Sequence, residues 1–196
     1  MDDDQVIQKY LEDQITCIEE LKTKSKNTIK NILNILIKAR DSDKQVFVIG
    51  NGGSASTATH FTSDLLKTSL TENSKRFKTI SLSDNIPVLL AWANDSSYEN
   101  IFVEQLRNFM KKDDILIGIS GSGNSVNVVK AVEYANSIGA HTIALTGKGG
   151  GKLLNLAMTN LIIPSNDMLG IETMHLLVCH LLTTMIRSRG KPIFSY

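Results

Sequence analysis

The chain of 196 residues balances 21 basic against 20 acidic residues, which gives a formal net charge of +1 at pH 7. So small a charge excludes the strong field that draws nucleic acid or an acidic membrane surface, and we expect neither as a partner. The N-terminus is acidic and no apolar run reaches about 18 residues, so the sequence predicts neither a signal peptide nor a membrane span. Cys17 and Cys179 are lone cysteines, typical of reduced thiols, and the sequence thus indicates a cytoplasmic protein.

The N-terminal part of the chain is expected to be helical. Apolar residues recur at helical spacing over residues 4–24 and again over residues 27–40. Two amphipathic helices in succession predict a helical hairpin within residues 1–43. This is more helix than a minimal α/β domain requires, so we expect it to contact another copy of the chain.

From residue 44 to about residue 190 the sequence alternates between strand and helix patterns. Strands are expected over residues 45–50, 77–82, 114–119, 141–146 and 159–163. Helices are expected over about 54–67, 86–94, 99–110, 125–138, 150–156 and 169–188. Such alternation predicts an α/β fold, a doubly wound parallel sheet of five strands with helices on both faces. No linker or repeat divides the chain, so we expect residues 1–196 to form one domain.

The first expected strand ends in a glycine-rich turn. Asn51, Gly52, Gly53 and Ser54 follow it directly. Glycines at a strand-to-helix junction let backbone N–H groups approach a ligand, and the helix N-terminus favours an anion. The glycine spacing fits neither the dinucleotide fingerprint nor the Walker loop. An ordinary strand-to-helix connection is the alternative for this turn taken alone.

A second turn of the same design follows the strand at 114–119. Ser120, Ser122 and Ser125 stand within six residues and are spaced by glycines such as Gly121. Hydroxyl donors beside unpaired backbone amides suit the oxygens of a phosphate monoester without any Arg or Lys. Because the carboxyl ends of parallel strands meet at one edge of a sheet, we expect both turns to face the same crevice.

Two expected helices carry side chains suited to acid–base chemistry. His60 and Asp64 lie four residues apart and share one helix face, while Glu172 and His180 belong to the last helix. Asp64 and Glu172 are candidate general bases, His180 is a candidate acid or base, and His60 is an orienting group or a metal ligand. All four together could also bind Zn²⁺, which accepts imidazole and carboxylate ligands.

The spacing of Glu172 and His180 restricts how these residues can meet. Eight residues of continuous helix span about 12 Å, so both side chains cannot easily reach one point from one helix. Either the last helix begins after Glu172, or one of the groups comes from a neighbouring subunit. The second possibility predicts an active site at a subunit interface.

Other polar residues lie at the ends of expected strands or at the starts of expected helices. Among them are Ser83-Asp84, Asn94-Asp95, Thr146 and Asn166-Asp167. Asp and Asn commonly cap helices and form turns, so these positions have an ordinary structural explanation as well.

Several of these motifs resemble the sugar-isomerase (SIS) domain family, and within it the bacterial sedoheptulose-7-phosphate isomerases. The resemblance covers about residues 3–190 and is most specific at residues 50–54, 119–128 and 145–148 and at His175 and His180. It implies an isomerase that converts sedoheptulose 7-phosphate to a heptose 7-phosphate for lipopolysaccharide or other surface polysaccharides. It also implies a homotetramer and a zinc ion in the active site.

The resemblance also implies roles for individual residues. Phosphate binding falls to Ser120, Ser122 and Ser125, with the Gly121 amide helping. Substrate contacts are expected from Asn51, Gly52, Gly53, Ser54, Asp95, Thr146 and Asp167. The catalytic or metal-ligand positions are those of His60, Asp64, Glu172 and His180.

Three positions depart from the family's usual residues. Asp64 stands where a Glu is usual and is one methylene shorter, Glu172 replaces a Gln and adds a negative charge, and Gly121 replaces a Thr and removes a hydroxyl. Glu172 could therefore act as the base or strengthen a metal site by its charge. Equally, the changes could indicate a different substrate.

The implied reaction moves a proton between C1 and C2 through an enediol(ate). Asp64 or Glu172 would serve as the base toward carbon, and His180 as the acid or base toward oxygen. Two alternatives stay open. The chain could be a non-catalytic phosphosugar-binding or adaptor protein, such as a partner of a replication initiator, or it could isomerise another sugar phosphate.

Overall fold

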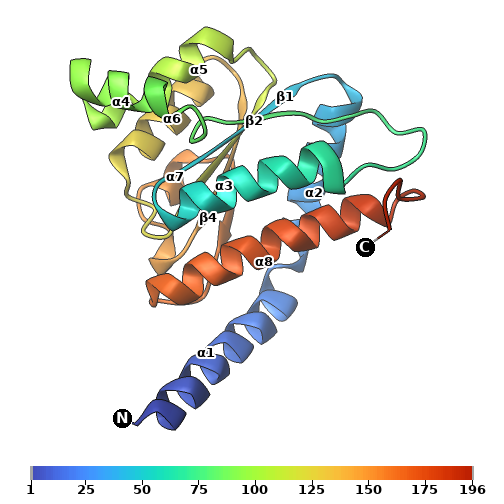
Figure 1. Ribbon diagram of the computed structural model, residues 1–196, viewed down its shortest axis with the longest axis vertical. Helices are drawn as coiled ribbons and strands as arrows, with labels where there is room; N and C mark the ends of the chain where they lie inside the picture. Colours follow the sequence, from blue (N-terminus) through green and yellow to red (C-terminus); the bar gives the residue numbers. More distant parts are fainter. Residues whose placement is uncertain (1, 196) are drawn as a thin grey trace.

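The computed structural model describes residues 2–195, which fold around one sheet of five parallel strands (Figure 1). The strands are β1 (Gln45–Gly50), β2 (Lys78–Ser81), β3 (Ile115–Ser120), β4 (His141–Thr146) and β5 (Thr159–Ile162). Their order in the sheet is β2-β1-β3-β4-β5, and every neighbouring pair is parallel. The order reverses between β1 and β3, so the turns that follow these two strands flank the switch point. The predicted α/β class and five-stranded sheet are confirmed.

Helices cover both faces of this sheet. The α-helices are α1 (Asp3–Lys24), α2 (Lys26–Asp41), α3 (Gly53–Ser63), α4 (Ile86–Asp95), α5 (Val103–Phe109), α6 (Val126–Ser137), α7 (Leu153–Leu156) and α8 (Met168–Arg187). Three short turns complete the set, namely the π-helical η1 (Asp64–Thr68) and the 3₁₀ turns η2 (Tyr98–Asn100) and η3 (Lys148–Gly150).

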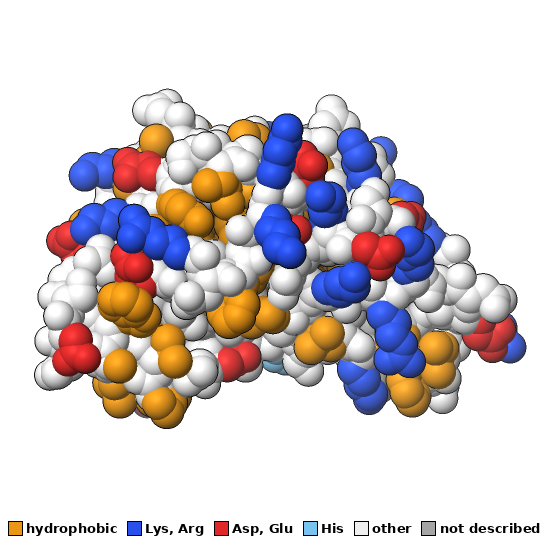
Figure 2. All heavy atoms as spheres, turned by 90° about the horizontal axis from the view of Figure 1, so that it is seen from above, with side chains coloured by type: hydrophobic (Ala, Val, Ile, Leu, Met, Phe, Trp, Pro, Cys, Tyr) orange, Lys and Arg blue, Asp and Glu red, His pale blue; other side chains and the backbone are white. Residues whose placement is uncertain are grey.

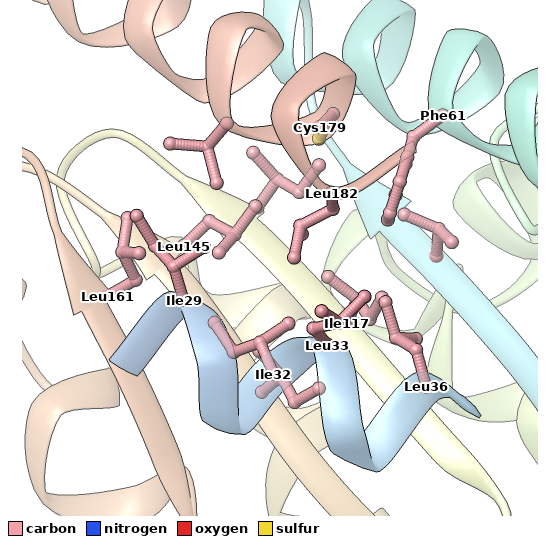
Figure 3. Packing of buried hydrophobic residues seen from close by; sticks show 14 of the residues in the cluster. Ile29, Ile32, Leu33, Leu36, Phe61, Ile117, Leu145, Leu161, Cys179 and Leu182 are labelled. Atoms are coloured by element: carbon pink, nitrogen blue, oxygen red, sulfur yellow. The ribbon is translucent and has the colours of Figure 1, made fainter. Parts of the chain in front are cut away.

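The strands separate two hydrophobic cores because successive side chains point to opposite faces. In β1, Val46 and Val48 pack with residues of α2, α3 and α8, whereas Phe47 and Ile49 pack with residues of α5, α6 and α7, and all four are fully buried. Figure 3 shows the first core, in which the leucines and isoleucines of α2 point toward the sheet and α8.

The predicted N-terminal hairpin is wrong in its geometry. Only Ser25 separates α1 from α2, and helical hydrogen bonds continue across it, from Ser25 N–H to the Leu21 carbonyl (3.0 Å) and from Ile29 N–H to the Ser25 carbonyl (2.9 Å). The helices therefore bend instead of folding back, and α1 projects from the body of the molecule (Figure 1). This leaves apolar side chains of α1 uncovered, with Ile7 57% and Ile15 60% exposed.

Helix α8 occupies the core. By length and composition it is the one helix within residues 2–195 that could span a membrane, yet half of that stretch is buried inside the protein. Its buried residues join the core that also contains α2 and α3. This is the behaviour of a central packing helix.

Helix α4 is covered much less. None of its ten residues is buried, although its sequence is largely apolar, and Leu90 is 64% exposed. It lies at the top of the molecule in Figure 1, and Figure 2 shows groups of hydrophobic side chains among charged ones on the face seen from above.

Candidate active site

The structure brings three of the predicted side chains together between α3 and α8. The Nε2 atoms of His60 and His180 lie 3.0 Å apart, and the Asp64 Oδ2 atom lies 3.9 Å from the first and 3.8 Å from the second. Asp64 is 8% exposed, whereas both imidazole rings are about half exposed. In this cluster the carboxylate of Asp64 is therefore buried, and the two imidazole rings reach the surface.

Asp64 lies where the helix type changes, and its own N–H still bonds to the His60 carbonyl as in an α-helix. The sequence predicts one helix over 54–67, but α3 ends at Ser63 and η1 begins at Asp64. The N–H of Ser69 bonds to the Asp64 carbonyl five residues back, at 2.8 Å. The π turn ends this helix, and single π turns occur frequently at functional sites.

These three residues form a possible metal site. Two imidazole nitrogens and one carboxylate oxygen lie within 4.8 Å of one another, and this is the donor set of a catalytic zinc site that keeps a fourth position open. Cys179 is next to His180 in sequence, but its side chain packs in the hydrophobic core and is not part of this group. Burial and the charge of Asp64 raise the pKa of its thiol. Cys17 and Cys179 are both buried free thiols.

Glu172 does not join this group within one chain, which corrects the expected set of four. Helix α8 begins at Met168, so Glu172 and His180 lie on one continuous helix, eight residues and about 12 Å apart. The Glu172 carboxylate instead lies against Gly53, the first residue of α3. A carboxylate there is stabilised by the partial positive charge of the helix N-terminus.

Two of the three hydroxyl groups of the serine-rich turn after β3 lie together. The Oγ atoms of Ser120 and Ser125 lie 3.1 Å apart, and Ser122 Oγ accepts a hydrogen bond from the Asn124 N–H at 3.2 Å. Gly123 has a φ of +66°, and a side chain there would overlap the carbonyl of Gly150. This close approach holds the turn against η3.

Helix α8 runs past all three parts of the candidate site. At its start Met168 lies against Gly121 of the serine turn, and any side chain at position 121 would overlap its sulfur. One turn later Glu172 lies against Gly53 of the glycine turn, and two further turns place His180 in the His60 cluster. The spacing along a single helix therefore sets the relative positions of both turns and the cluster.

The remaining predicted residues are less uniform in their placement. Asp167 caps α8 by accepting a hydrogen bond from Gly170 N–H at 2.6 Å, and Asp95 is exposed at the end of α4. Ser54 is buried in the first turn of α3. Thr146 is fully buried at the end of β4, and its hydroxyl has no partner within residues 2–195.

Sequence reasoning assigned no role to three residues close to these parts. Tyr98 and Asn127 both hydrogen-bond to Asn51, at 2.9 Å each. His175 is fully buried in α8, where burial lowers its pKa to about 4. The resemblance named His175 and the segment that contains Asn127, but no pattern marks an exposed tyrosine such as Tyr98.

Comparison with known proteins identifies the family of this chain. Residues 9–147 match the model of the SIS domain. A phosphoheptose isomerase of Helicobacter pylori (strain P12) is 42% identical over 158 residues, 81% of this chain and 82% of that protein. One of Leptospira biflexa is 35% identical over 187 residues, 95% of this chain and 96% of that protein.

A solved structure supports the same relationship. The structure of a phosphoheptose isomerase from Francisella tularensis superposes with a TM-score of 0.90 at 30% identity, covering 96% of this chain and 100% of that chain. These relatives are enzymes, which favours the catalytic interpretation over the adaptor alternative. The chain belongs to the SIS-domain family and, within it, to the phosphoheptose isomerases.

Proposed function

We propose that this chain is an aldose–ketose isomerase that converts sedoheptulose 7-phosphate to D-glycero-D-manno-heptose 7-phosphate, for the heptose of surface polysaccharides. The observation that carries the proposal is the close grouping of His60, Asp64 and His180. A protein that only binds a phosphosugar has no need of two imidazoles and a carboxylate at one point. The serine turn supplies the phosphate-binding hydroxyls, and the Gly121 amide adds a donor.

The isomerisation needs one group to move the carbon-bound proton and another to move the hydroxyl proton. In the metal-free protein, Asp64 or Glu172 takes the first role and His180 the second. With zinc bound, His60, Asp64 and His180 would hold the ion, which would supply positive charge for the oxyanion that develops on the sugar, and Glu172 would be the base. Phosphate binding at Ser120, Ser122 and Ser125 orients the sugar for these steps.

We further propose that the working site lies between copies of the chain. Along α8, Met168 marks the serine turn and His180 marks the cluster, twelve residues and about 18 Å further on. A seven-carbon phosphate ester is shorter than this separation. One substrate therefore cannot reach both the serine turn and the cluster of the same chain. A site formed by the turns of one copy and the cluster of another removes this restriction, and it could also bring Glu172 to the cluster.

The uncovered helices support an oligomer, which we propose to be a homotetramer. The apolar face of α1 is exposed, and an apolar groove between α1, α2 and α8 is lined by Ile18, Leu21 and Leu181, among others. Exposed apolar area of this kind marks protein contact surfaces. Each copy, residues 1–196, would be one domain located in the cytoplasm.

The decisive experiment is to incubate sedoheptulose 7-phosphate with metal-free protein and then with zinc-loaded protein. Appearance of heptose 7-phosphate supports the proposal, and the ratio of the two rates gives the contribution of zinc to catalysis. If the sugar raises the melting temperature without turnover, the isomerase proposal fails and a sensing role takes its place. Testing other ketose phosphates in parallel would identify a different substrate.

A further inference from the structure

Asn51 and Asn127 form a reciprocal amide pair that joins the two ligand-binding turns. Asn51 Nδ2 donates to Asn127 Oδ1 at 2.9 Å, and Asn127 Nδ2 donates to Asn51 Oδ1 at 2.9 Å. Asn51 follows β1, and Asn127 lies in the first turn of α6, directly after the serine turn. The pair therefore fixes the glycine turn to the serine turn.

A backbone group determines which way both amides point. Val128 N–H, which can only donate, bonds to Asn127 Oδ1 at 2.9 Å. The oxygen of Asn127 is thereby identified, and its Nδ2 must face Asn51 Oδ1. Since Asn127 is 2% exposed, water competes little for this arrangement.

Tyr98, at the protein surface, adds a further hydrogen bond to this amide pair. Its hydroxyl donates to Asn51 Oδ1 at 2.9 Å, so this oxygen accepts two hydrogen bonds, which fill its two lone pairs. The Tyr98 residue is 58% exposed and contributes little to the core. The hydrogen bond to Asn51, and not packing in the core, is therefore the contact of Tyr98 that suggests a role.

Tyr98 is itself held in place by α6. Lys130 of this helix pairs with the Glu99 carboxylate at 2.7 Å and donates to Asn100 Oδ1 at 3.2 Å. All three residues of η2 thus connect to the elements that carry the two turns. This gives the Tyr98 hydroxyl a defined position above Asn51.

We propose that Tyr98 and Asn127 are positioning residues that hold the Asn51 amide with its nitrogen toward the substrate. One N–H of Asn51 is used in the amide pair, and the other is a donor for a hydroxyl or phosphate oxygen of the sugar phosphate. The oxygen of Asn51 is saturated and cannot accept from a sugar hydroxyl. This inference rests on the substrate-binding role proposed for Asn51.

The test is the variant Tyr98→Phe, which removes one hydroxyl from an exposed side chain. The KM for sedoheptulose 7-phosphate should rise by about two- to tenfold, the value of one neutral hydrogen bond, while kcat stays within about twofold. Tyr134→Phe, the same change two turns beyond Asn127 on α6, is the matched control and should leave KM unchanged. Circular dichroism and melting curves of all variants confirm folding.

A double-mutant cycle shows whether Tyr98 acts through Asn51. Asn51→Ala should raise KM, and adding Tyr98→Phe to it should raise KM no further, because residues acting through one another are not additive. Additive effects, or an unchanged KM in Tyr98→Phe alone, would overturn the inference and leave the proposed role of Asn51 intact. An unchanged KM in Asn51→Ala overturns both.

Asn127 is tested by Asn127→Asp, which keeps the acceptor for Val128 N–H but removes the donor to Asn51. Its KM should rise at least as much as that of Tyr98→Phe. Because the residue is buried, the added charge could unfold the protein, and Tyr98→Phe then decides alone. A folded Asn127→Asp variant with the parent's KM contradicts the inference.

Discussion

The carboxylate of Glu172 lies against Gly53 so closely that any side chain at position 53 would overlap it. The contact joins α8 to the first residue of α3. It is the carboxylate end of a flexible side chain that is in the way, so the clash can be relieved by moving Glu172 and not the backbone.

This relationship predicts the effect of Gly53→Ala. The folding free energy should change by less than about 1 kcal/mol, because alanine suits a helix and Glu172 can move away. The value of kcat should fall by about tenfold or more, because small displacements of a reacting group are costly. Urea unfolding and turnover of sedoheptulose 7-phosphate measure the two effects separately.

The control for this prediction is the Glu172→Ala background. There the displaced carboxylate is absent, so Gly53→Ala should cause no further loss of kcat. If Gly53→Ala lowers kcat equally in both backgrounds, the glycine acts on the substrate directly and not through Glu172.

The His60 cluster predicts how zinc affinity responds to substitution. Asp64→Ala or His180→Ala should weaken zinc binding by more than about a hundredfold, which exceeds the loss usual when a residue that only hydrogen-bonds to a ligand is removed. Asp41→Ala, an exposed carboxylate at the end of α2, is the control and should retain the parent's affinity. Competition with a chromophoric chelator measures this without reference to activity, and unchanged affinity in both cluster variants would exclude these ligands.

Buried His175 predicts a loss of stability in acid. Its pKa is lowered by burial from 6.5 to about 4, so between these values the unfolded chain binds a proton that the folded protein does not. The free energy of unfolding should therefore fall as pH drops from 6.5 toward 4, by about 3 kcal/mol in total from this residue. Urea unfolding at pH 7, 5.5 and 4.5 gives the slope, which His175→Leu should flatten. An equal slope in the variant would show that other groups cause it.

The uncovered face of α1 predicts the effect of charge on assembly. Ile7→Asp with Ile15→Asp should dissociate the oligomer, since burying each such side chain contributes about 1.5–3 kcal/mol. Lys9→Glu places a negative charge two residues from Ile7, on the other side of the helix, and should leave the assembly intact. Sedimentation velocity reports both results, and a parent protein that is monomeric at micromolar concentration would contradict the proposed tetramer.

The central strands β1, β3 and β4 were predictable because each has an apolar run and a glycine or polar turn after it. Strand ends differ from the expected ones by one residue at most, as in β2, expected over 77–82 and found over Lys78–Ser81. The serine turn was also predictable, since its hydroxyls are adjacent in sequence. The local composition of the chain was sufficient to predict both the strands and the serine turn.

The sequence did not reveal local breaks within helices or the contacts that fix short turns to distant segments. Helical periodicity cannot distinguish a π turn at Asp64 from a continued α-helix, nor a bend at Ser25 from a hairpin. Likewise the expected helix over 99–110 is divided into η2 and α5, and η2 is fixed by Lys130 on α6. The separation of Glu172 from the cluster, in contrast, is what the eight-residue spacing predicts for one continuous helix, and the start of α8 at Met168 excludes the alternative of a helix that begins after Glu172.

Helix α8 carries Met168, Glu172 and His180 at fixed intervals along one rigid rod. Inserting a single residue between Glu172 and His180 would turn the histidine by about 100° and shift it by about 1.5 Å. Loops elsewhere in the chain can lengthen or shorten at little cost. Length variation among functional descendants of this sequence should therefore be absent from residues 168–180, whatever substitutions accumulate there.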